Sequence, residues 1–169
     1  MRRKKPDFNE YIIPIDTVFD GERKTITQDD GIRPDTSLEK LAALTPCFLE
    51  NGLVTAATSS QVSDGAGFAV IMSAQKAARL HLKPLLKFVA FSTAGVDPAY
   101  MGLGPIEAVP KVLKKAGLTI NDMDTVELNE AFAAQMLPCM KELEIPFEKA
   151  NPYGGAMALG HPMGATGIS

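Results

Sequence analysis

The segment from Asn151 to Gly167, NPYGGAMALGHPMGATG, surrounds one histidine with glycines. His161 is the only histidine in this segment. Glycine loses more conformational freedom on folding than any other residue, so such a run is kept where backbone must approach another group closely or adopt a positive φ. The segment therefore predicts backbone packed closely around an imidazole, and imidazoles act as general bases.

Two other interpretations of this segment compete. A glycine-rich stretch with one histidine is often only a turn, but here the glycines alternate with small apolar residues at 156–159, which indicates close packing rather than a flexible linker. A phosphate-binding loop would need lysine followed by serine or threonine after its last glycine. Gly167 is followed by Ile168 and Ser169 instead, which argues against such a loop.

A second motif, Leu128 to Gln135 (LNEAFAAQ), lies where an expected strand gives way to an expected helix. Loops at such places commonly carry function. Asn129 has two interpretations there. Its side chain can cap the helix by accepting a backbone N–H from the first turn, or its amide can hold a water and help to polarise a carbonyl. The residues leave both open.

The elements that must position these motifs alternate between strands and helices. We expect strands at 53–58, 68–72, 86–91 and 124–128. We expect helices at 38–44 after a capping box at 36–39, at 75–80, at 105–116 with Gly117 closing it, and at 130–143. Outside the 38–44 helix, the first fifty residues are expected to be irregular and polar. Pro110 and Pro138 predict late starts or kinks in their helices. The alternation indicates a layered α/β architecture.

Composition sets limits on the class of protein. A chain of 169 residues that is 46% hydrophobic fits one folded domain, and a net charge of −3 gives no reason to propose nucleic-acid binding. The basic residues at 2–5 are expected to form a solvated arm. The sequence shows no secretory signal, and no apolar run approaches the roughly 18 residues of a membrane span. We expect an intracellular, cytoplasmic protein with no membrane contact, and the organelle is left open.

The sequence contains two cysteines, Cys47 and Cys139. Their positions give no metal-ligand spacing and no disulfide framework, so we expect no metal site. Either thiol could act as a nucleophile in principle, but we expect both to be buried for packing.

Several stretches, in a fixed order, match one known family. They are Asp30-Gly31-Ile32-Arg33-Pro34, Thr36-Ser37-Leu38-Glu39-Lys40-Leu41, Asp64-Gly65-Ala66, Met101-Gly102-Leu103-Gly104-Pro105, Lys114-Lys115-Ala116-Gly117-Leu118, Asn129-Glu130-Ala131-Phe132, Gly154-Gly155 and Gly160-His161-Pro162. In this order they resemble the thiolase family, the acyl-CoA C-acyltransferases. The likeness spans nearly the whole chain, and ketoacyl synthases and the sterol-carrier type of thiolase differ at the Asn-Glu-Ala-Phe position.

The resemblance implies an α/β, thiolase-like layered αβαβα fold that is incomplete. Residues 1–50 would be the rear part of the thiolase loop region. Residues 51–82 would be the last strand and helix of the N-terminal half, and residues 83–169 a truncated C-terminal domain. Acyl-CoA and free CoA would be the partners, together with a further copy of the chain or a complementary thiolase half.

The resemblance also implies an activity, namely thiolytic cleavage of 3-ketoacyl-CoA or the reverse Claisen condensation. His161 would activate a nucleophilic cysteine and contribute a donor to an oxyanion hole, and Asn129 would hold a water that donates into the same hole. Ser60, Met101 and Phe132 would line the acyl or CoA site. Coenzyme A would be a substrate, with no permanently bound cofactor.

The family's two catalytic cysteines have no counterpart in residues 1–169. The acyl-accepting cysteine belongs to the part upstream of the matched region, and the acid/base cysteine belongs to a Cys-x-Gly-Gly-Gly motif beyond Gly-His-Pro. We therefore expect no turnover by this chain alone. It would be one segment of an acyltransferase, a non-catalytic CoA-binding or interaction protein with a thiolase-derived fold, or a gene remnant without function.

Overall fold

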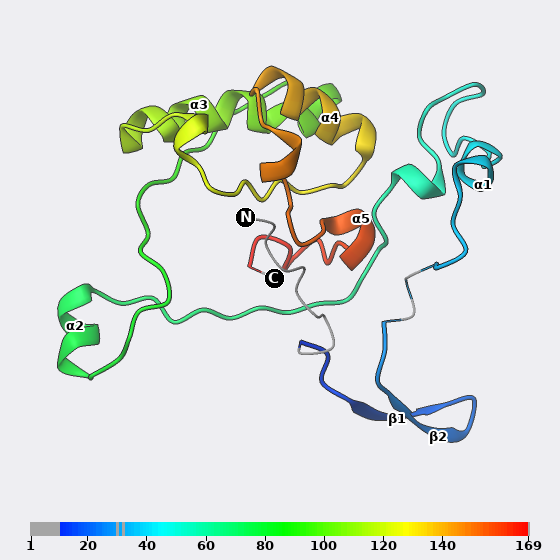
Figure 1. The fold of residues 1–169 in the computed structure, drawn as a ribbon, viewed down its shortest axis with the longest axis horizontal. Helices are drawn as coiled ribbons and strands as arrows, with labels where there is room; N and C mark the ends of the chain where they lie inside the picture. Colours follow the sequence, from blue (N-terminus) through cyan, green and yellow to red (C-terminus); the bar gives the residue numbers. More distant parts are fainter. Residues whose placement is uncertain (1–10, 30, 32, 169) are drawn as a thin grey trace. The chain divides into compact units, whose positions relative to one another are not determined.

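The computed structural model describes residues 11–29, 31 and 33–168, and the basic residues at 2–5 lie outside this part (Figure 1). The chain divides into two compact units, Met1–Leu44 and Thr45–Ser169. Among the described residues, none of the helices has the length and apolar character needed to cross a membrane.

The first unit contains a β-hairpin. β1 (Ile15–Phe19) pairs antiparallel with β2 (Glu22–Ile26). The two residues that join them, Asp20 and Gly21, have φ values of 51° and 80°. Positive φ at both positions suits a two-residue hairpin turn, and Asp-Gly is a preferred sequence for it. The expectation of irregular structure in this region is therefore wrong, and the Asp-Gly pair is the signal that predicts the hairpin.

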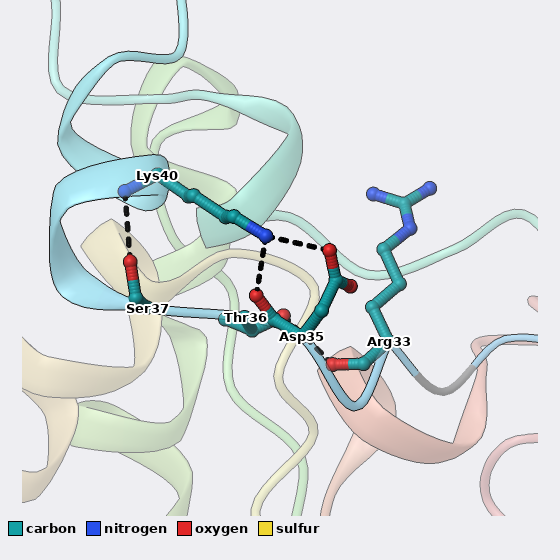
Figure 2. Close-up of polar contacts among 5 residues, drawn as sticks. All are labelled: Arg33, Asp35, Thr36, Ser37 and Lys40. Atoms are coloured by element: carbon teal, nitrogen blue, oxygen red, sulfur yellow. Dashed lines mark hydrogen bonds and ion pairs between the residues drawn. The ribbon is translucent and has the colours of Figure 1, made fainter.

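α1 (Leu38–Ala42) begins where the capping signal predicts it. The Ser37 hydroxyl accepts the Lys40 backbone N–H at 3.3 Å, as Figure 2 shows. The Lys40 ammonium reaches back to the carboxylate of Asp35, with Nζ 2.6 Å from Oδ2. The helix ends at Ala42, two residues earlier than expected, because only local contacts support so short an element.

The described residues of the second unit, 45–168, form four α-helices joined by 3₁₀ turns and extended segments. The helices are α2 (Ala74–Arg79), α3 (Gly104–Ala116), α4 (Ala133–Glu142) and α5 (Ala156–Leu159). α3 packs beside α4 (Figure 1). α3 ends at Ala116, and the next residue, Gly117, caps it with a left-handed φ of 67°, as the sequence predicts. Pro110 and Pro138 lie inside α3 and α4, and neither helix ends at its proline.

The strands expected in the second unit are not formed. Within the predicted strand 53–58, residues 56–58 form a 3₁₀ turn instead. Residues 68–72 and 86–91 run without a strand partner in the described part of the chain. The predicted strand 124–128 is reduced to a single bridge between Val126 and Ala150. A strand exists only where a neighbour accepts and donates its hydrogen bonds. These four predictions are therefore wrong, although the segments at 68–72 and 86–91 are strongly apolar.

The core of the second unit lies under α4. Met136, Met140 and Ile145 are buried together, and Val126 and Leu128 pack against them. This packing fixes the segment at 126–128 against α4, and Asn129 follows that segment directly.

α4 begins at Ala133, with Phe132 at its N-cap position. Asn129 lies outside the helix, and residues 130–132 separate the two. The interpretation of Asn129 as a helix N-cap is therefore wrong, which leaves its side chain available for other contacts.

Candidate functional site

Asn129 and His161 lie side by side. Nδ2 of Asn129 is 3.4 Å from Nε2 of His161, although the two residues are 32 positions apart in the chain. His161 is half-buried and Asn129 is exposed. A polar pair of this kind can direct an amide donor and an imidazole nitrogen toward one ligand atom.

The backbone around Asn129 is held by the side chain of Asn151. Its Oδ1 accepts the Leu128 N–H at 2.8 Å, and its Nδ2 donates to the Leu128 carbonyl at 2.8 Å. The same Nδ2 donates to Oε1 of Glu130 at 2.7 Å. Asn151 thus contacts the residues on both sides of Asn129 and fixes the position from which its amide projects.

Glycines allow the Glu130 carboxylate to enter the loop before His161. Oε2 of Glu130 accepts the N–H of Met157, in the first turn of α5, at 3.2 Å. A Cβ atom added at Gly155 would overlap the same carboxylate, and Gly160 has a φ of 101°. These two positions show the close approach and the positive φ that the glycine-rich sequence predicts.

His161 is fixed through its backbone and its ring. Its N–H donates to the Gln61 carbonyl at 3.0 Å, in a parallel bridge to Val62. Nδ1 of the ring lies 2.7 Å from Oγ1 of Thr166. Nothing in the sequence alone indicates a role for Thr166. A hydroxyl five residues beyond a histidine is no signal until the turn between them is known.

The other three residues expected at the site differ in their placement. Ser60 donates its backbone N–H to the carbonyl of Ala131 at 3.0 Å, beside the Asn129 loop. The Phe132 ring meets Phe48 edge-on, with 6.4 Å between ring centroids. Met101 is exposed in the 3₁₀ turn before α3, and no described contact joins it to the Asn129–His161 pair.

The two cysteines have different environments. Cys139 is fully buried on α4, its Sγ 3.5 Å from the Gly102 carbonyl, and burial raises the pKa of its thiol. Cys47 is exposed, so the expectation that both are buried is wrong for Cys47. Within the described residues no hydrogen bond joins either thiol to His161. In that same part of the chain, no cluster of three or more histidine, cysteine or acidic side chains could hold a metal.

Comparison with known protein families shows to which family the chain belongs. The profile of the thiolase N-terminal domain matches residues 2–75, and that of the thiolase C-terminal domain matches residues 82–169. The chain belongs to the thiolase family. Its fold is accordingly an incomplete form of the α/β thiolase fold, as the sequence analysis expects. The predicted division of the chain into residues 1–50, 51–82 and 83–169 stays a prediction.

Individual thiolases show how much of the fold is covered. Peroxisomal 3-ketoacyl-CoA thiolase B of Rattus norvegicus is 51% identical over 98% of this chain and 40% of its own length. A probable acetyl-CoA acyltransferase of Staphylococcus epidermidis is 46% identical over 95% of this chain and 41% of its own. The chain thus spans about two fifths of the curated relatives that it matches.

Solved thiolase structures give the same result. The acetyl-CoA acetyltransferase of Bacillus anthracis superposes with a TM-score of 0.85 at 41% identity, over 95% of this chain and 41% of that one. Human mitochondrial 3-ketoacyl-CoA thiolase in complex with CoA superposes with a TM-score of 0.83 at 43% identity, over 92% of this chain and 38% of the human one. Relatives from several compartments share the fold, so the cytoplasmic location stays a prediction.

Proposed function

We propose that this chain supplies the histidine and asparagine of a thiolase-family C-acyltransferase site. The reaction is thiolytic cleavage of a 3-ketoacyl-CoA or the reverse Claisen condensation. The observation that supports it is the 3.4 Å approach of Asn129 to His161, two side chains from separate family motifs.

The chemistry of the pair fits this reaction. Cleavage and condensation both build negative charge on a thioester oxygen, and one positioned donor to such an oxygen is worth about 3 kcal/mol of barrier. The Asn129 amide supplies a donor, directly or through a water. His161 takes the proton of the attacking thiol and then supplies a second donor from the same nitrogen.

Substrate contacts complete the proposal. Phe132, whose ring meets Phe48 edge-on, offers an aromatic surface three residues after Asn129. Ser60 and Met101 belong to the same acyl or pantetheine site by their match to the family motifs. Coenzyme A is a substrate rather than a bound cofactor, and a human relative was solved with CoA present.

The proposed site is incomplete within residues 1–169, because a thiolase needs a nucleophilic cysteine and neither Cys47 nor Cys139 contacts His161. Covalent catalysis requires that nucleophile. We therefore propose that the chain is inactive alone and works with a complementing part that carries both cysteine motifs. The exposed apolar segments at 68–72 and 86–91 support such a partner, because neither has a strand partner within the described residues.

A thiolysis assay tests the proposal. Release of acetyl-CoA from acetoacetyl-CoA is measured for the chain alone and for the chain mixed with the upstream and downstream parts of a bacterial thiolase. We expect activity only in the mixture, and its loss in His161→Ala. Activity of the chain alone that Cys47→Ser or Cys139→Ser removes would overturn it.

The binding alternative has a separate readout. If the mixture forms a stable complex without thiolysis, yet equilibrium dialysis shows that the chain retains CoA, the non-catalytic CoA-binding role replaces the acyltransferase role. His161→Ala then leaves CoA retention unchanged.

A further inference from the structure

The imidazole of His161 has hydrogen-bond partners on both ring nitrogens. On one side, Nδ1 lies 2.7 Å from the Thr166 hydroxyl oxygen. On the other, Nε2 lies 3.4 Å from the Asn129 amide nitrogen. A neutral imidazole carries one N–H and one lone pair, so the two partners together decide which nitrogen carries the hydrogen.

The Thr166 hydroxyl has only one hydrogen to donate. Its Oγ1 donates to the carbonyl oxygen of Pro162 at 3.0 Å. The backbone N–H groups of Ala165 and Thr166 donate to the same carbonyl at 2.7 and 2.8 Å, so the turn from Pro162 fixes the hydroxyl in place as the third donor to that oxygen. With its hydrogen used there, the oxygen presents only lone pairs to His161. Nδ1 must then be the donor.

The second side of the ring leads to the same result by a separate route. Nδ2 of Asn129 is an amide nitrogen, which donates hydrogen bonds and does not accept them. Its neighbour Nε2 must therefore accept. We propose that Thr166 is a positioning residue that keeps the hydrogen of His161 on Nδ1 and the lone pair on Nε2.

This inference matters for catalysis only if the proposed acyltransferase function holds. A lone pair on Nε2 can take the proton from a thiol, leaving a thiolate and an imidazolium whose Nδ1–H still bonds to Thr166. Nε2–H and the Asn129 amide are then two donors beside one another, as a developing oxyanion requires. With the hydrogen on Nε2 from the start, the ring cannot accept the proton there.

The test uses the fact that the chain has two histidines, His81 and His161. The chain is labelled with ¹⁵N-histidine, and the ring nitrogens are observed by NMR where both rings are neutral. His81 is exposed, and no side-chain hydrogen bond is described for it, so it reports the unconstrained tautomer mixture. His161→Gln assigns the signals. We expect His161 to show one protonated nitrogen, Nδ1.

Two matched variants separate positioning from packing. Thr166→Val keeps the side-chain shape and removes the hydroxyl, so the His161 signals should shift toward the mixture seen for His81. Thr166→Ser restores the hydroxyl and should restore the Nδ1–H pattern. Circular dichroism is recorded for each, and the spectra are repeated in the complex with the complementing thiolase parts. A wild-type ring protonated on Nε2 refutes the proposal, as does a folded Thr166→Val chain with an unchanged tautomer.

The effect of Thr166 on catalysis is measured in the complex of this chain with the complementing thiolase parts. Thr166→Val should lower kcat at least about tenfold with little change in KM, since general-base catalysis contributes roughly 10²–10⁴ in rate. Thr166→Ser should remain near the wild-type rate. Absence of thiolysis in the wild-type complex removes the proposed function but leaves the tautomer result standing. A lower kcat in Thr166→Val with an unaltered tautomer contradicts the inference itself.

Discussion

The carboxamide of Asn151 pairs with the backbone of Leu128 as a neighbouring strand would, with one 2.8 Å bond to its N–H and one 2.8 Å bond to its C=O. Asn151 adopts a φ of 40°, which asparagine tolerates better than most residues. The pairing fixes the chain one residue before Asn129. It therefore connects the glycine-rich segment to the asparagine of the site.

Replacing Asn151 should loosen the Asn129 loop. Asn151→Gly keeps the backbone conformation and removes three hydrogen bonds, one of them to a carboxylate, so we expect a loss of about 2–4 kcal/mol in the free energy of unfolding. Asn151→Asp should cost at least as much, because it loses both donors and places a second carboxylate against Glu130. Urea unfolding measures both, with the exposed Asn121→Gly as the control. A change in Asn151→Gly no larger than the control's would contradict this assignment.

A side chain at Gly155 should displace Glu130. The added Cβ of Gly155→Ala overlaps the carboxylate that bonds to Asn151 and Met157, so we expect a loss of about 2 kcal/mol from overpacking. Gly164→Ala is the matched control, because a Cβ there has open space and the change should stay within about 0.5 kcal/mol. Thermal unfolding of the two variants checks the difference. Equal midpoints would refute the close contact.

The two thiols should react at different rates. Cys47 is exposed, whereas Cys139 is fully buried and burial raises the pKa of its thiol, so less of the reactive thiolate is present at a given pH. We expect Cys139 to be alkylated by iodoacetamide at least about tenfold more slowly than Cys47 in the native chain. Cys47→Ser and Cys139→Ser isolate each rate by mass spectrometry, and urea should remove the difference. Equal native rates would show that α4 does not protect its cysteine.

The raised pKa of Cys139 also predicts a pH dependence. In the unfolded chain the thiol ionises at lower pH than in the folded chain, so its contribution to stability is present below the unfolded pKa and is lost as pH rises through the folded one. Unfolding of the chain should therefore become easier in alkaline buffer. Cys139→Ala should flatten that alkaline decline, and an identical slope in the variant would assign the decline to other groups.

The exposed apolar segments should bind hydrophobic dyes. Phe68 is 96% exposed, Leu85 95% and Leu86 91%. Contiguous apolar surface and unpaired strand-like backbone promote association. We expect fluorescence enhancement of an apolar dye and concentration-dependent light scattering from the chain alone, both reduced by the complementing thiolase parts. A chain that stays monomeric at all concentrations and does not enhance the dye's fluorescence would contradict this expectation.

Local signals in the sequence predict local structure well. The cap at Ser37 and the left-handed Gly117 lie where the sequence places them, because each depends on hydrogen bonds within a few residues. The apolar pattern at 86–91 predicts a strand, yet the described residues form none there. Its hydrogen bonds would have to come from another part of the molecule, about which its own residues say nothing.

The candidate site shows the same division. Asn129 and His161 could be named from their motifs through the family resemblance, and the structure brings them together. Asn151 and Thr166 could not be named from the sequence. The contacts of Asn151 depend on its own φ of 40°, and those of Thr166 depend on a turn that brings its hydroxyl to Nδ1 of His161. Of the two interpretations of Asn129, the helix cap requires α4 to begin at residue 130, whereas the helix begins at Ala133.

The extended backbone at 68–72 and 86–91 has a kinetic consequence. In the proposed complementation, the backbone hydrogen bonds of these segments form when the chain meets the complementing part, so that folding step is second order. Its rate rises with the concentration of the complementing part until an internal rearrangement becomes limiting. Dilution then delays the acquisition of structure itself, and the order in which the parts are synthesised decides how long these segments stay open to mispairing.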